Sequence, residues 1–298
     1  MSNKSCLSPL LFTQSISFCW TSVGQIMIFM QYPASKTVRR TNIMKRISLI
    51  LAAVLLLTAF FTGCAKTEPV AAGYQGIDVV SPEWVGKLDA AKDAKQIFVV
   101  AALSEDATDA WISLHEKQND GNWHMIITTP GFIGRNGLGK TKEGDAKTPV
   151  GVFHFNRAFG IADDPGSLIP YVKVDENTYW SGDPREGYHY NELVNLKDLP
   201  GLDVESGDSE HIIDYVYHYQ YCLNISYNEE GTPGLGSAIF LHCFGPVKPY
   251  TGGCVAIPED YMRYVLQRVD ENTVVVINTY EALSDGADWP SSFWPSDR

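Results

Sequence analysis

Short apolar runs, several with alternating hydrophobic and polar positions, follow one another along the chain from about residue 84. Runs of this length, bounded by glycine, proline and polar residues, are typical of β-strands. A glycine-rich connection at 130–155 leads into one such strand. We predict the other strands at 96–103 (QIFVVAAL), 110–117 (AWISLHEK), 122–129 (NWHMIITT), 215–228 (YVYHYQYCLNISYN), 237–244 (SAIFLHCF) and 273–280 (TVVVINTY).

Helical spacing occurs clearly in one segment, 258–270 (PEDYMRYVLQRVD). It begins with a proline and two acids, and its apolar residues recur every three to four positions, as a helix with one buried face requires. Many strands with one clear helix predict a mostly β single domain with one or a few short helices. We place this domain at 83–282 and expect an irregular tail at 283–298.

A different pattern precedes the domain: an uncharged, predominantly apolar run at 47–61 (ISLILAAVLLLTAFF) directly after Met44, Lys45 and Arg46. It is shorter than the roughly 20 residues of a membrane-spanning helix and has the layout of a signal peptide. It ends in FTGC, which resembles the lipobox of bacterial lipoproteins. The resemblance implies a signal peptide at 44–63, a lipid on Cys64 and a tethering linker at 64–82.

An uncleaved anchor helix is the alternative to that lipoprotein signal, and both place the domain outside the cytoplasmic membrane. Residues 1–43 precede the signal and have no evident role. Because Met44 followed by two basic residues is the better signal start, we expect 1–43 to be a misassigned extension. N-terminal sequencing of the precursor would decide between Met1 and Met44.

The charge of the chain is strongly divided. The first 64 residues hold six basic residues and no acid, so the remainder carries 17 basic residues and all 35 acids, a net charge of −18. A body this acidic repels phosphate backbones, so we expect no nucleic-acid partner. The six cysteines form no CxxC pair and no cluster with histidine, and we expect no metal site. Cys222 and Cys243 lie in neighbouring predicted strands, where two packed thiols are favoured over a disulfide.

Cys254, in the sequence TGGCVAIP at 251–258, is the cysteine whose neighbours most favour a catalytic role. A free cysteine usually packs, and becomes a nucleophile where a base takes its proton. His242 ends a predicted strand twelve residues upstream, where alternation puts it on one face with Phe240 and apart from Leu241 and Cys243. The alternative for His242 is a core histidine bonded to a backbone carbonyl.

The glycines next to this cysteine have a chemical use as well. Gly252 and Gly253 let the backbone approach a substrate carbonyl, so the N–H groups of Gly253 and Cys254 are candidates for an oxyanion hole. The alternative is a plain tight turn that requires positive φ.

These residues carry a resemblance to a known family. LHCFG…YTGGCVAI at 241–257 is similar to the catalytic motif of the L,D-transpeptidases (YkuD-type domain), and GDAKTPVGVFHF at 144–155 resembles a second family block. YWSGDPREGYHYN at 179–191 resembles a subgroup whose motif reads Gly-Cys-Val-Ala. Three positions depart from the common pattern: Gly252 replaces a histidine, Ala256 an arginine and Cys243 a glycine.

The resemblance implies a β-sandwich domain that acts on peptidoglycan stem peptides without metal or cofactor. Cys254, as a thiolate paired with His242, would attack the third residue, usually a diamino acid, and release D-Ala. A neighbouring stem would then resolve the thioester into a 3–3 cross-link. Thr251 falls on the Ser/Thr of the motif, and the backbone carbonyl of Cys243 would orient the imidazole.

Several alternatives stay open at this point. Water could resolve the same thioester, which would make the protein an L,D-carboxypeptidase, or the fold could serve a non-catalytic wall-binding lipoprotein. Tyr188, Tyr190 and Asn191 are candidates for a substrate groove or are surface residues, and His218 is expected to be a strand residue. We expect a monomer, lipid-anchored to the cell membrane and facing the cell wall.

Overall fold

The computed structural model describes residues 73–288. The predicted signal peptide, the extension at 1–43 and Cys64 lie outside the described residues. The described strands are β1 (Val79–Val80), β2 (Gln96–Ala102), β3 (Asp109–Lys117), β4 (Trp123–Phe132), β5 (Gly151–Gly160), β6 (Tyr171–Lys173), β7 (Thr178–Trp180), β8 (Leu193–Asn195), β9 (Glu210–His211), β10 (Cys222–Ile225), β11 (Phe240–Cys243), β12 (Val255–Ile257) and β13 (Val274–Thr279). The helices are α2 (Glu259–Leu266) and α3 (Tyr280–Ser284), with 3₁₀ turns at Val85–Lys87, Asp89–Ala91 and Ile212–Asp214.

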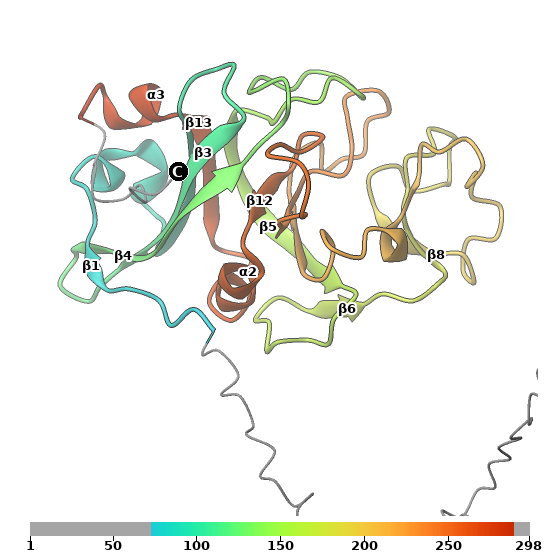
Figure 1. Ribbon diagram of the computed structural model, residues 1–298, viewed down its shortest axis with the longest axis horizontal. Helices are drawn as coiled ribbons and strands as arrows, with labels where there is room; N and C mark the ends of the chain where they lie inside the picture. The colour runs from blue at the N-terminus through green and yellow to red at the C-terminus, as the bar shows by residue number, and fades with distance from the viewer. Residues whose placement is uncertain (1–72, 289–298) are drawn as a thin grey trace, which may run out of the picture. The chain divides into compact units, whose positions relative to one another are not determined.

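Most of these strands form one sheet that rolls back on itself. Its order is β1-β4-β12-β11-β10-β5-β13-β2-β3, β6 extends it beside β5, and an additional β3–β4 pairing closes the path. Three of its pairs, β11–β12, β13–β2 and β5–β6, are parallel. Figure 1 shows β3, β4, β5, β12 and β13 gathered around a common centre, with α2 at its lower end. The mostly β prediction is confirmed.

A large apolar core fills the space between the two halves of this sheet, and two smaller clusters of buried apolar side chains lie outside it. Phe98, Ile112 and Ile127 come from one half, and Phe155 and Leu241 come from the other. The predicted helix is present as α2, shorter than expected, and the apolar side chains that its spacing placed on one face are buried in that core. Burial of this kind, at about 25 cal/mol per Å² of apolar surface, is the dominant stabilising contribution.

A small three-stranded sheet, β8-β7-β9, packs against the main sheet beside β11. Trp180 of β7 provides the contact: its ring lies 4.7 Å from that of Phe240 and 5.7 Å from that of Phe159. In Figure 1 the region around β8 stands to one side of the rolled sheet. Tyr219 connects this second sheet to the predicted histidine, because its hydroxyl donates to Glu210 of β9 and its ring lies 5.5 Å from that of His242.

One sequence-based prediction of a strand is wrong over about half of its length. Residues 215–221 are turns, and only Cys222–Ile225 of the predicted strand at 215–228 is extended. The stacked rings of Tyr215 and Tyr219, 4.6 Å apart, hold this segment as a turn. Residues of the predicted linker also contact the domain: Tyr74 stacks on Tyr261 of α2 at 3.9 Å, and Val79–Val80 pairs with β4.

Within the described part of the chain, no helix has the length and apolarity needed to cross a membrane. The end of α3 falls within the predicted tail at 283–298, and residues 289–298 lie outside the described residues.

Candidate active site

Cys254 and His242 are brought together by the parallel pairing of β11 and β12. In this register Leu241 lies opposite Val255, which places Cys254 beside Phe240, two residues before His242 along β11. The amide of Phe240 lies 3.4 Å from the Cys254 sulfur. Successive residues on one face of a strand are about 7 Å apart, so the cysteine and histidine side chains share a face with an offset between them.

The predicted alternation of faces along β11 is confirmed. Phe240 and Cys254 belong to the cluster under the small sheet, whereas Leu241 and Cys243 belong to the main core. His242 is 5% exposed and Cys254 7% exposed. Cys222 and Cys243 are free buried thiols, as favoured from the sequence.

The turn that carries Cys254 is held by the hydroxyl of Thr251. This hydroxyl donates to the carbonyl of Cys254 at 2.7 Å and accepts the amide of Gly253 at 3.0 Å. Thr251 is itself fixed through its backbone, which exchanges hydrogen bonds with Ile133 and Arg135 at 2.8 and 3.0 Å. Thr251 therefore positions the nucleophile turn and does not face substrate with a free hydroxyl.

Thr148, in the second family block at 144–155, also holds this turn in place. The Thr148 hydroxyl, which is fully buried, donates to the carbonyl of Gly253 at 2.7 Å and accepts the amide of Gly134 at 2.9 Å. The two sequence blocks are therefore in direct contact, although 105 residues separate Thr148 from Gly253. The sequence showed Thr148 only as a motif match; its role as a clamp becomes visible only in three dimensions.

The two glycines next to the cysteine differ in their roles. Gly253 has φ +144°, and a Cβ there would meet the carbonyl of Lys147 at 2.9 Å, so this position requires glycine. Gly252 has open space around it. The Gly253 N–H, which was predicted to be part of an oxyanion hole, donates to the Thr251 hydroxyl in this structure.

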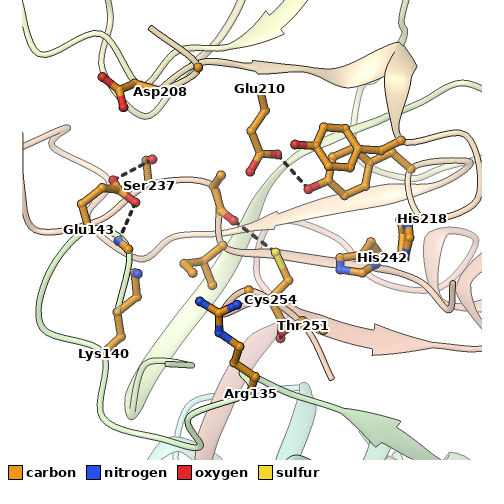
Figure 2. Close-up of a pocket in the computed structure, with 18 of the residues that line it drawn as sticks. Arg135, Lys140, Glu143, Asp208, Glu210, His218, Ser237, His242, Thr251 and Cys254 are labelled. Carbon is orange, nitrogen blue, oxygen red and sulfur yellow. Dashed lines mark hydrogen bonds between the residues drawn. The ribbon is translucent and has the colours of Figure 1, made fainter. Parts of the chain in front are cut away.

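The Cys254 thiol donates a hydrogen bond to the carbonyl of Ala238 at 3.1 Å (Figure 2). Ala238 has a positive φ of +55°, a conformation that costs a non-glycine residue about 1 kcal/mol or more. The side-chain carbonyl of Asn191 accepts the Ala238 amide at 3.0 Å and so supports that conformation. Burial, together with the negative charge of Glu210, raises the pKa of the Cys254 thiol to about 12.

The His242 ring has a defined tautomer. Its Nδ1 lies 2.8 Å from the carbonyl of Cys243, and because a carbonyl only accepts, Nδ1 carries the proton and Nε2 is the basic nitrogen. This is the backbone carbonyl contact that the resemblance implied. Burial lowers the pKa of His242 to about 4, so the imidazole is neutral.

The thiolate–imidazolium pair that the resemblance implied is absent from the described structure. Both groups are neutral, and no hydrogen bond joins Cys254 to His242 within the described residues. The physical reason is burial, which disfavours the charged form of each group.

The three groove candidates lie in different environments. Tyr190 lines the cavity and donates to Glu143. Tyr188 lies under the Arg185 guanidinium, 4.1 Å from its ring centre, outside the cavity. Asn191 is buried and bonds to Trp180 and Ala238, so it supports the site from behind.

A cavity of about 1020 Å³ opens beside Cys254 and His242. It is also lined by residues that the sequence patterns had not indicated, namely Arg135, Glu143, Glu210, Tyr219, Lys248 and His218. Figure 2 shows Glu210 and Arg135 on opposite sides of the Cys254 sulfur. The prediction that His218 is a strand residue is wrong: it lies in a turn, with its ring 5.8 Å from that of His242.

Within residues 73–288, no three side chains of His, Cys, Asp or Glu are grouped as a metal site would require. The arrangement of a thiol, a neutral imidazole with a free basic nitrogen and a large cavity suits acyl transfer through a covalent intermediate.

Comparisons with known proteins found similar solved structures and one matching family model. Similar solved structures include the helical cell shape determining protein Pgp2 from Campylobacter jejuni, with 17% identity over 66% of this chain and 54% of that chain and a TM-score of 0.32. L,D-transpeptidase 1 of Mycobacterium tuberculosis has 12% identity over 61% of this chain and 60% of that chain, with a TM-score of 0.30. The chain therefore spans about half to three fifths of these proteins.

Among curated proteins, no sequence matches the chain. The family model of the L,D-transpeptidase catalytic domain (YkuD) matches residues 111–277, which is more than half of the chain and includes Thr148, His242 and Cys254. The chain belongs to the YkuD L,D-transpeptidase catalytic-domain family.

Proposed function

We propose that this protein is a peptidoglycan L,D-transpeptidase that acts through a thioester on Cys254 and forms 3–3 cross-links between stem peptides. One observation carries the proposal: Cys254 and His242 line the same cavity, and the Cys243 carbonyl leaves His242 Nε2 as a free base. A nucleophile beside a base whose tautomer is held by a third group is the signature of covalent acyl transfer.

The first half of the reaction forms the acyl-enzyme. The Cys254 side chain rotates away from the Ala238 carbonyl, and His242 Nε2 takes the thiol proton. The thiolate attacks the carbonyl of the third stem residue, and the bond to the terminal D-Ala breaks. His242 returns its proton to the departing amine, so that the enzyme holds a neutral thioester.

The second half transfers the peptide. The side-chain amine of a neighbouring stem loses a proton to His242 and attacks the thioester, which forms the new amide and releases the thiolate. That thiolate recovers the proton from His242. With Gly253 N–H bound to Thr251, the amides of Gly252 and Cys254 are the remaining candidates to stabilise the oxyanion.

The proposal is tested with the purified protein, a disaccharide-tetrapeptide and mass spectrometry. A cross-linked dimer identifies a transpeptidase, and a tripeptide identifies an L,D-carboxypeptidase on the same thioester. Absence of both products, together with absence of a carbapenem adduct on the thiol, would overturn the enzymatic proposal. Cys254→Ala should abolish turnover and retain the fold, while Cys222→Ala, which removes a thiol outside the cavity, should keep turnover.

We also propose that the protein is lipid-anchored through Cys64 and faces the cell wall, on the sequence of the signal region alone. Metabolic labelling with a fatty acid should mark the wild-type protein and spare Cys64→Ser. Equal labelling of both proteins would exclude Cys64 as the lipidation site.

A further inference from the structure

Glu210 is an acidic group of the cavity that the proposed acyl transfer does not use. It lies on β9, half-buried, and its Oε2 accepts the hydroxyl of Tyr219 at 2.8 Å. No basic side chain among the described residues forms an ion pair with it. A carboxylate in such surroundings loses water contacts and gains one neutral hydrogen bond in exchange, and burial accordingly raises its pKa to about 7.

The other charged groups of the cavity do not satisfy this acid. Lys140 is bound to Asp145 at 3.1 Å. Glu143 accepts the hydroxyls of Tyr190 and Ser237 and adds a second negative charge on the same side. Figure 2 shows Asp208, Glu143 and Glu210 along one side of the cavity and Arg135 on the other, with the Cys254 sulfur between them.

A cation supplied by the ligand would give this acidic side of the cavity the positive partner that it lacks among the described residues. An ammonium group offers three donors and a full positive charge, and charge-assisted hydrogen bonds are about twice as strong as neutral ones. The stem peptide of the proposed reaction carries such a group next to the scissile bond, on its diamino acid. We propose that Glu210 binds the side-chain ammonium of that diamino acid and thereby selects the stem peptide; this inference rests on the proposed function.

The position of Glu210 links this selection to the nucleophile. Its negative charge faces the Cys254 thiol and opposes thiolate formation. An ammonium bound to Glu210 neutralises that charge, so the correct substrate relieves the repulsion when it arrives. A peptide without the amine leaves the repulsion in place. Glu210 is thus a specificity residue that binds the side-chain ammonium group next to the scissile bond.

The test measures binding, which requires no turnover. In full-length Cys254→Ala protein, the affinity for a disaccharide-tetrapeptide with a free side-chain amine is compared by calorimetry with that for the same peptide acetylated on that amine. The comparison is repeated with Glu210→Gln, which retains the acceptor for Tyr219. Glu192→Gln is the matched control, because Glu192 is an exposed acid outside the cavity.

We expect acetylation to weaken binding by about 10- to 100-fold in Cys254→Ala and in its Glu192→Gln variant, as for loss of a charge-assisted bond. In the Glu210→Gln variant this penalty should shrink to about threefold or less. An unchanged penalty, or equal weakening of both peptides by Glu210→Gln, would overturn the inference. Failure of the proposed function is seen separately, as absence of turnover by the wild-type protein.

Discussion

At the scale of single residues, the site is held in a neutral resting state. The Cys254 thiol donates to the Ala238 carbonyl, and His242 donates to the Cys243 carbonyl, so each group is satisfied by backbone and neither is charged. Burial of both groups makes an ion pair between them costly. Activation therefore requires a change in local charge or in the orientation of Cys254 when substrate binds.

The first prediction concerns the charge on Glu210. Glu210 is ionised above about pH 7, where it raises the pKa of the Cys254 thiol. Glu210→Gln removes that charge, so alkylation of Cys254 by iodoacetamide should become roughly threefold faster or more at pH 8–9. Below pH 7 wild-type Glu210 is itself protonated, and the two rates should converge. Peptide mapping by mass spectrometry follows the reaction at Cys254, and equal rates at pH 9 would contradict the prediction.

The two glycines provide a second prediction. Gly253→Ala forces a Cβ to 2.9 Å from the Lys147 carbonyl at φ +144°, which should cost about 1–3 kcal/mol of unfolding free energy. Gly252→Ala enters open space and should change that free energy by about 0.5 kcal/mol or less. Urea denaturation of both variants measures the difference. Equal destabilisation would show that the turn does not depend on the geometry described.

At the scale of elements, the site depends on contacts between segments that are far apart in the chain. The loop between β4 and β5 carries Thr148, which binds the nucleophile turn before β12. The small sheet adds Glu210, and the segment 237–239 before β11 adds the Ala238 carbonyl, supported by Asn191. The β4–β5 loop also contributes Arg135 and Lys140 to the cavity, and no single segment forms the site alone.

A third prediction tests the clamp at Thr148. Thr148→Val keeps the shape but leaves the Gly134 amide and the Gly253 carbonyl without their buried partner, which should cost about 1–3 kcal/mol. Turnover by Thr148→Val should also fall, because the turn that carries Cys254 is no longer held in position. Thr148→Ser retains the hydroxyl and should recover most of the loss. Thr141→Val, in an exposed position of the same loop, is the control, and a similar loss there would refute the clamp.

At the scale of the whole molecule, the closed sheet and the segment before it are joined by a buried histidine. His115 of β3 is fully buried and lies 2.8 Å from the hydroxyl of Ser81 and 2.7 Å from that of Ser113. Burial lowers its pKa to about 3. In the unfolded chain His115 takes up a proton below about pH 6.5, whereas the folded protein cannot do so until far lower pH.

The fourth prediction follows from this difference. Because the unfolded state binds more protons between about pH 6.5 and pH 3, the contribution of His115 to stability falls as the pH falls through that window. His115→Asn should be less stable at pH 7 but should lose less further stability between pH 6.5 and 4.5 than the wild type. Urea midpoints at several pH values measure this. His189→Asn, at an exposed position with positive φ, should follow the wild type, and parallel curves for all three proteins would contradict the prediction.

Sequence patterns located much of this fold. The runs at 96–103, 110–117 and 122–129 became β2, β3 and β4, because each is buried along most of its length and its hydrophobicity reflects that burial. The segment 215–221 misled the same reasoning. Its aromatic residues line a cavity and stack on one another in a turn. In the sequence alone, such an aromatic run looks the same as a strand.

The sequence by itself determined the mostly β class, the helix after Pro258, and Cys254 and His242 as candidate catalytic residues. It could do so because local periodicity and short motifs depend on neighbours in the chain. Only the tertiary structure decided which N–H groups are free, that Thr148 clamps the turn, that both catalytic candidates are neutral and that Glu210 faces the thiol. Those properties arise from contacts and burial between distant segments, where the energy of a group depends on its surroundings in space.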